Sequence, residues 1–153
     1  MADLIKIEDI TIRKIDKNQY VSGQITIDVI EEIAKYGITL IINNRPDNEE
    51  VDQVRSEELK LKAKSLGIKF IDIPFSGNSL TKENIIDFSK LIKNSYDEKS
   101  LFFCRSGARS STIWGLASVL YLDLNIVDVM NKINDIGYDS TVLPNMVEYF
   151  KNN

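Results

Sequence analysis

The sequence contains no histidine and a single cysteine, Cys104. Without histidine, the chain cannot build a Ser-His-Asp triad, a Cys-His protease pair, or a zinc or haem site held by imidazole. With one cysteine, it cannot form an internal disulfide, a thiolate zinc cluster or a redox pair with a second, resolving cysteine. Any chemistry must therefore come from a lone thiol or from carboxylates, and we expect no metal and no cofactor.

Proline and glycine are also scarce, and no apolar run approaches the roughly 20 residues of a membrane span. The start, residues 1–4, has no basic region followed by a long apolar stretch, so we expect a cytoplasmic protein without a membrane partner. A net charge of -4 argues against nucleic acid as a partner, so any anion site must be local. With 43% hydrophobic and 27% charged residues, residues 1–153 are typical of a single soluble domain.

Short apolar runs alternate with amphipathic helical patterns along the chain. The runs of strand character are 10–13, 20–22, 38–42, 68–73 and 101–103. The helical patterns are 26–37, with Thr26 as cap, 56–67, 81–92, with Thr81 as cap, 110–122, 126–136 and 144–150. This alternation predicts an α/β fold: a single domain with a central, mainly parallel sheet of four or five strands and helices on both faces. Ligands of such sheets bind beyond the carboxyl ends of the strands.

The segment from Cys104 to Ser111 follows a predicted strand and opens a predicted helix. Backbone N–H groups and the positive end of a helix dipole meet at such a position, which favours an anion. The same field stabilises a thiolate and makes the sulfur of Cys104 nucleophilic. Arg109 can bind an oxyanion through two parallel hydrogen bonds. We expect the oxyanion to be held by Arg105, Ser106, Gly107, Ala108 and Arg109. Phe102, Phe103 and Trp114 are expected in the core.

Three stretches of the sequence resemble one bacterial family, the beta-lactamase-hydrolase-like, phosphatase-like proteins, and the resemblance covers about residues 10–138. This family is a branch of the cysteine-dependent tyrosine and dual-specificity phosphatases. The stretches are Tyr20–Gln24, Gly37–Pro46 and Cys104–Ser110. The resemblance implies a phosphatase fold with Cys104 as nucleophile, Arg109 as oxyanion binder and Ser110 beside the thiolate. It also suggests that Asn43 supports the cysteine loop.

The sequence departs from the main phosphatase pattern in three places. Arg109 lies five residues after the cysteine instead of six, a spacing similar to that of rhodanese-type sulfurtransferases. Phe103 stands where a histidine usually precedes the cysteine. The loop that carries the general acid in dual-specificity phosphatases reads Phe75–Asn78 here and contains no acid. We therefore place the proton donor in the acidic segment after Asn44, with Asp47 first and Glu49 or Glu50 next, whereas Asp72 is expected to be structural.

Three functions follow from these observations. The first is a phosphatase that cleaves phosphate monoesters of a small molecule or a phosphoprotein through a cysteinyl-phosphate on Cys104. The second is a rhodanese-like sulfurtransferase or persulfide handler, favoured by the loop spacing. The third is a binding module that holds an oxyanion without turnover. The resemblance outside the loop favours the phosphatase.

Overall fold

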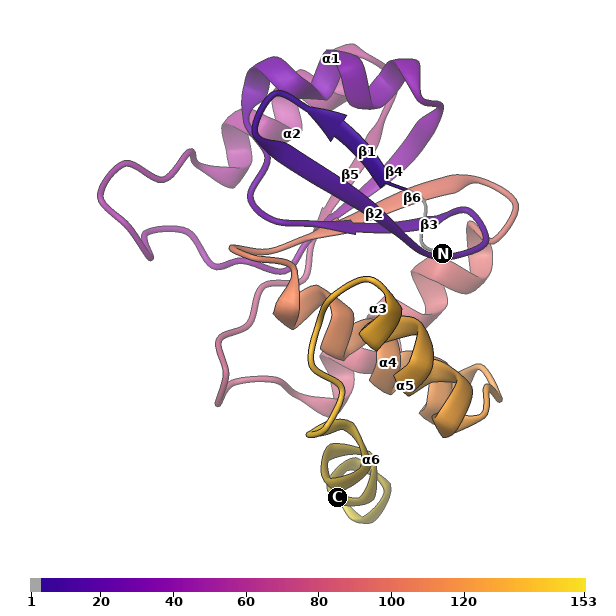
Figure 1. Cartoon of the computed structure of the whole chain (residues 1–153). Helices are drawn as coiled ribbons and strands as arrows, with labels where there is room; N and C mark the ends of the chain where they lie inside the picture. Colours follow the sequence, from indigo (N-terminus) through magenta and orange to yellow (C-terminus); the bar gives the residue numbers. More distant parts are fainter. Residues whose placement is uncertain (1–3) are drawn as a thin grey trace.

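The computed structural model describes residues 4–153, which form an α/β domain around a six-stranded sheet (Figure 1). The strands are β1 (Leu4–Ile7), β2 (Ile10–Asp16), β3 (Gln19–Ser22), β4 (Ile38–Asn43), β5 (Lys69–Asp72) and β6 (Lys99–Phe103). The helices are α1 (Ile27–Lys35), α2 (Ser56–Ser65), α3 (Lys82–Asn94), α4 (Ala108–Tyr121), α5 (Ile126–Asp135) and α6 (Leu143–Asn152).

The sheet has the strand order β1-β2-β3-β6-β4-β5. Strands β3, β6, β4 and β5 are parallel neighbours, whereas β1 and β2 are antiparallel at one edge. The predicted mainly parallel sheet is therefore confirmed. It has six strands in place of the predicted four or five, because residues 4–7 pair with β2 in register, Ile5 opposite Ile12, and extend the edge.

Helices cover both faces of the sheet, as predicted: α1 and α2 lie on one face and α3, α4, α5 and α6 on the other (Figure 1). Successive strand residues face opposite sides of a sheet, so each strand contributes to two cores. In β6, Phe102 packs into the core under α3 and α4, while Leu101 and Phe103 pack into the core under α1 and α2. Phe102, Phe103 and Trp114 are fully buried, which confirms their predicted place in the core.

Helix starts agree with the sequence prediction at some positions and differ at others. Thr81 caps α3 as predicted, accepting a hydrogen bond from Asn84 N at 3.1 Å. Thr26 holds the capping position of α1, but its side chain makes no capping hydrogen bond. Helix α4 begins at Ala108, two residues before the predicted start, because Gly107 with a φ of 100° turns the chain directly into the helix.

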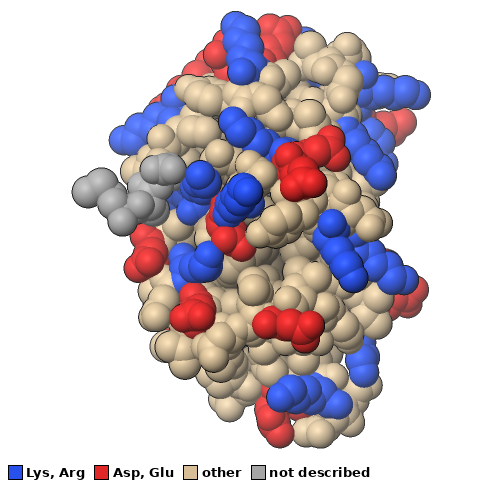
Figure 2. Space-filling model, turned by 90° about the vertical axis from the view of Figure 1, so that its right-hand side faces the viewer, with Lys and Arg blue, Asp and Glu red and all other residues tan. Residues whose placement is uncertain are grey.

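No helix within residues 4–153 is long and apolar enough to cross a membrane. Residues 1–3, part of the start that predicted a cytoplasmic protein, lie outside the described residues. On the face shown in Figure 2, basic and acidic side chains are interspersed over an uncharged surface.

Candidate active site

The cysteine loop lies where two neighbouring parallel strands of the sheet, β6 and β4, end. Strand β6 ends at Phe103, which pairs with Asn43 at the end of β4, and Cys104 follows directly. Cys104 is a free, buried thiol, and α4 starts at Ala108. The sulfur is thus placed at the carboxyl edge of the parallel strands and close to the N-terminus of a 14-residue helix, where backbone dipoles favour an anion.

Three carbonyl groups, one at the end of β6 and two in the loop, accept hydrogen bonds from the surrounding scaffold. The bonds run from Asn44 N to Phe103 O (2.8 Å), from Gln24 N to Arg105 O (3.1 Å) and from the hydroxyl of Tyr138 to Ser106 O (2.7 Å). Gly107 N donates in the other direction, to the Cys104 sulfur at 3.1 Å. With its carbonyls bound to the scaffold, the loop can present N–H groups to an anion at the sulfur.

Two glycines permit this close fit. A Cβ atom at Gly23 would lie 2.9 Å from Arg105 O, so a side chain there would push the loop away. A Cβ atom at Gly107 would collide with the Tyr138 hydroxyl, and its φ of 100° is one that other residues rarely adopt. Burial also raises the pKa of Tyr138, so its hydroxyl stays protonated and able to donate.

Arg109 is held by a carboxylate from another part of the chain. Its Nη1 and Nη2 donate to the two oxygens of Glu49 at 2.8 and 2.9 Å, and Nη1 also donates to Phe75 O at 3.1 Å. A guanidinium has five N–H donors, so Nε–H and one Nη2–H remain for a bound oxyanion. The hydrogen bonds with Glu49 are the main cause that raises the pKa of Arg109, and the nearby Cys104 sulfur adds to it. Glu49 thus fixes the guanidinium and leaves one donor edge open.

Arg45 joins this pair to the other end of the loop. It is 4% exposed and binds Glu49 through Nε (2.8 Å) and Glu50 through Nη2 (2.9 Å). Glu50 in turn forms an ion pair with Arg105, whose Nε lies 2.9 Å from Glu50 Oε1. A continuous ion-pair network therefore runs from Arg105 to Arg109 through the segment 45–50, and a buried arginine requires such partners to offset its desolvation.

The acidic residues expected to supply the proton make hydrogen bonds and ion pairs with other side chains. Asp47 accepts hydrogen bonds from the backbone N and the hydroxyl of Ser56 at the start of α2, at 2.9 and 3.3 Å, and makes no ion pair with the cysteine loop within residues 4–153. Hydrogen bonds from Arg109 and Arg45 lower the pKa of Glu49 to about 2, so it is ionised near neutrality. Glu50 is bound to Arg45 and Arg105. In the structure these acids therefore make anchoring contacts with Ser56 and with the arginines. The identity of the proton donor stays a prediction.

The residue beneath the loop is Asn44, one position beyond the one that the resemblance suggested. Asn43 binds Arg45 and Asp72, its Nδ2 donating to Asp72 Oδ1 at 3.0 Å, and no hydrogen bond in the described chain joins its side chain to the loop. Asn44 Oδ1 accepts from the Ser110 hydroxyl at 2.8 Å. The hydroxyl of Ser110 is therefore directed to Asn44, while Asp72 has the structural contacts expected of it, including Lys60 at 3.3 Å.

The remaining loop residues differ in what they present. The Arg105 side chain is 67% exposed and turned to Glu50, so it lies at the rim. The Ser106 hydroxyl accepts from Ala108 N at 3.3 Å, which tightens the turn before α4.

A polar cavity of about 340 Å³ opens beside the loop and is lined by Arg13, Gly23, Gln24, Arg105, Ser106 and Tyr138 among others. No group of three or more acids, cysteines or histidines suited to a metal occurs in the described part of the chain.

The sequence is similar to those of known proteins. The profile of the family "Beta-lactamase hydrolase-like protein, phosphatase-like domain" matches residues 11–120. The chain belongs to this family. A member from Xylella fastidiosa is 31% identical over 106 residues, which are 69% of this chain and 24% of that protein. The chain thus spans about a quarter of the length of that curated relative.

Solved structures similar to this chain include phosphatases. A candidate phosphatase from Neisseria meningitidis has 26% identity and a TM-score of 0.72, with 91% of this chain and 95% of that chain covered. PTPMT1, solved in complex with PI(5)P, has 12% identity and a TM-score of 0.71, with 92% and 95% covered, and this likeness shows the fold alone. The phosphatase-like family and fold expected from the three stretches are thereby confirmed.

Sequence reasoning missed Arg45 as the centre of the ion-pair network. Its signal was available, since Arg45 lies in the stretch Gly37–Pro46 that carries the family resemblance and is followed by three acids within five residues. Tyr138 was also missed, because it lies 32 residues beyond Ser106 and no motif marks it.

Proposed function

We propose that the protein hydrolyses phosphate monoesters through a covalent intermediate on Cys104. The Cys104 thiolate attacks phosphorus, the S–P bond forms, and the P–O ester bond breaks to release the alcohol or phenol oxygen. Water then attacks the cysteinyl-phosphate, which frees inorganic phosphate and restores the thiolate. The observation that carries this proposal is the pairing of the Cys104 sulfur at the helix start with an Arg109 guanidinium whose open donor edge is fixed by Glu49.

The bound phosphoryl group would lie on the N–H groups of residues 105–109 and on Nε and Nη2 of Arg109. Preorganised donors at these positions stabilise the charge that develops in the transition state. The cavity beside the loop, with Arg13 and Arg105 in its wall, would receive the rest of the substrate. A phosphorylated small molecule is the class of substrate that we propose here, and PI(5)P, bound in the PTPMT1 structure of the same fold, is one example of that class.

We further propose that aryl esters are preferred over alkyl esters. The loop from Ser76 to Ser79 has no ionisable side chain, and Glu49 is an ionised anchor. A phenolate leaves without full protonation, so it does not require the general acid that contributes typically 10²–10⁴-fold in other enzymes.

The test compares aryl-phosphate hydrolysis in wild type, Cys104→Ser and Arg109→Lys. Cys104→Ser should abolish turnover and keep phosphate binding, and Arg109→Lys should lose most activity because a point charge cannot replace a planar fork. Arg55→Lys, an exposed arginine at the start of α2, is the matched control and should be unchanged.

The five-residue spacing from Cys104 to Arg109 favours a second candidate, sulfur transfer. In that reaction the thiolate takes the outer sulfur of thiosulfate, sulfite leaves, and cyanide removes the sulfur as thiocyanate. Thiocyanate formation well above aryl-phosphate hydrolysis, lost in Cys104→Ser, would replace the phosphatase proposal with this one. Tight phosphate binding without either activity would favour the binding module.

A further inference from the structure

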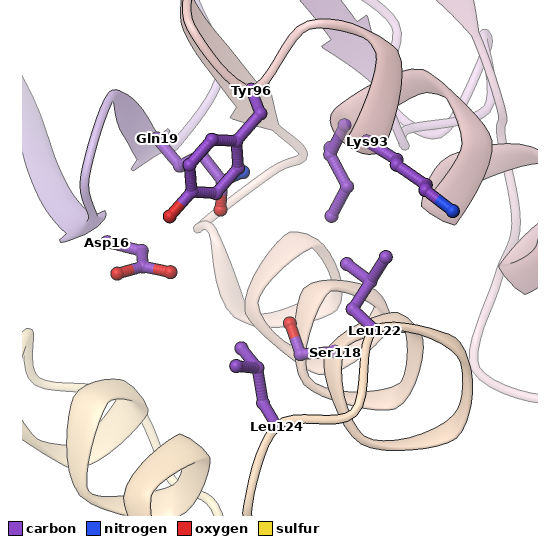
Figure 3. A pocket seen from close by; sticks show the side chains of 8 residues that line it. Asp16, Gln19, Lys93, Tyr96, Ser118, Leu122 and Leu124 are labelled. Atoms are coloured by element: carbon purple, nitrogen blue, oxygen red, sulfur yellow. The ribbon is translucent and has the colours of Figure 1, made fainter.

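A second cavity, of about 310 Å³, lies at the amino ends of the parallel strands, opposite to the carboxyl ends where Cys104 lies. Gln19, the first residue of β3, lines it, whereas Cys104 follows the last residue of β6, a strand parallel to β3. Its apolar wall comes from Ile92 of α3 and from Leu122 and Leu124 after α4 (Figure 3). The volume is at the lower end of the range of small-molecule sites.

Two of the uncharged polar side chains that line this mainly apolar cavity are buried, Gln19 and Ser118. Ser118 of α4 is fully buried and its hydroxyl has no hydrogen-bond partner within residues 4–153. Figure 3 shows this hydroxyl directed into the space between Leu122, Leu124 and Gln19. Trp114 Nε1 donates to Gln19 Oε1 at 2.7 Å, which leaves the amide nitrogen of Gln19 as the group that can serve a ligand. Buried polar groups normally have partners, so an unpaired one facing a cavity points to a ligand atom.

The charges at the cavity are balanced or turned away. Asp16 forms an ion pair with Lys132 at 2.7 Å. Lys93 directs its ammonium group away from the cavity in Figure 3. A charged ligand would lose its hydration here without an opposite charge to meet it, so the site fits a neutral molecule.

We propose that this cavity is a binding site for a neutral, mainly apolar small molecule that carries a carbonyl oxygen. The carbonyl accepts hydrogen bonds from the Ser118 hydroxyl and the Gln19 amide nitrogen, and the apolar body packs on Ile92, Leu122 and Leu124. This site is separate from the phosphate site and does not depend on the function proposed for Cys104.

The test uses three probes of one skeleton: 1-indanone, its hydrocarbon indane, and indane-1-carboxylate. Backbone and Gln19 side-chain amide shifts of the whole protein are followed by NMR while each probe is added. We expect saturable shifts around residues 118–124 with 1-indanone. We expect indane and the carboxylate to bind at least about five-fold more weakly, because the loss of one neutral hydrogen bond raises Kd by about that factor.

Two variants on the same helix complete the test. Ser118→Ala should weaken 1-indanone binding by about five-fold and leave indane unchanged. Ser111→Ala removes the other buried, unpartnered hydroxyl of α4, which lies outside the cavity, and should change neither. Equal binding of 1-indanone and indane, tighter binding of the carboxylate, shifts confined to residues 104–110, or an effect of Ser111→Ala equal to that of Ser118→Ala would each overturn the proposal.

Discussion

At the scale of residues, the loop depends on three of the chain's five arginines, and each has a different task. Arg109 faces the sulfur, Arg105 lies at the rim, and Arg45 is buried between the two glutamates that hold the others. Glu49 is central to this division because it binds Arg45 and Arg109 at the same time. Removing it would leave a buried guanidinium and a loop guanidinium each short of a partner, which is costly in both places.

The ionisation of Glu49 should couple folding to pH. Its pKa is about 2 in the folded protein against 4.5 for a free side chain. A lowered folded-state pKa means that the stabilisation is present above pH 4.5 and is lost as the pH falls from about 4.5 to about 2. Glu49→Gln should therefore destabilise the protein at pH 6, and the difference from wild type should shrink as the pH is lowered toward 2.

Urea unfolding of wild type and Glu49→Gln at several pH values between 3 and 6 measures this difference. Glu57→Gln, in the exposed first turn of α2, is a suitable control, and its difference from wild type should be small at every pH. A Glu49→Gln difference that stays constant over the range would contradict the assignment of an ionised anchor.

At the scale of elements, the turn from β6 into α4 determines how the loop fits its neighbours. Gly107 adopts a left-handed conformation there, and Tyr138, from the segment after α5, lies directly against it. The Tyr138 hydroxyl also binds Ser106 O, so the segment that follows α5 closes one side of the loop. The first turn of α4 is fastened from the other side, where the Ser110 hydroxyl binds Asn44 after β4.

Substitution of Gly107 by alanine should disturb both features of this turn. The new Cβ would require a rare φ and would displace Tyr138, so we expect a loss of about 1–3 kcal/mol in stability and a large fall in phosphate affinity. Gly77→Ala is the matched control because no atom lies within 4 Å of the added Cβ and its φ is ordinary.

Isothermal titration with inorganic phosphate and thermal unfolding measure the two quantities for Gly107→Ala and Gly77→Ala. Equal phosphate affinity in Gly107→Ala and wild type would show that the left-handed turn is not needed to form the anion site.

At the scale of the whole molecule, α4 connects the loop to the larger of the two cores. It contacts α3, α5 and α6, and Gly115 at its middle lets Ile133 of α5 and Leu143 of α6 approach closely. A Cβ at Gly115 would lie 3.0 Å from Ile133 and 3.1 Å from Leu143. The last helices therefore support the helix that begins at the active loop, although they carry none of the loop residues themselves.

Leu143→Ala should cost stability without changing the site. Leu143 is 1% exposed, so its truncation leaves a cavity between α4 and α6 and should lower the free energy of unfolding by about 2–5 kcal/mol. Leu61→Ala on α2, 65% exposed, should cost little.

Aryl-phosphate kinetics well below the unfolding temperature should give Leu143→Ala the turnover number of wild type. A matching loss of turnover in Leu143→Ala at that temperature would show instead that α6 positions the loop directly.

The layered fold and the position of the cysteine loop could be predicted from the sequence alone. The spacing of apolar residues is a local pattern, which can be recognised without knowing which residues make contact in the folded chain. Phe102, Phe103 and Trp114 could therefore be assigned to the core. The loop of Cys104 and Arg109 could be found because a strand, small residues and a helix start follow one another in the chain.

The side chains that support that loop could be identified only from the folded chain. Asn43 and Asn44 are neighbours with the same side chain, and the end of β4 turns only Asn44 toward Ser110, 66 residues away. Asp47, Glu49 and Glu50 form one acidic run, yet the fold directs Asp47 to α2, Glu49 to Arg109 and Glu50 to Arg105. Hydrogen bonds and ion pairs depend on direction and on partners far along the chain, so composition and spacing could name these residues but could not assign their contacts.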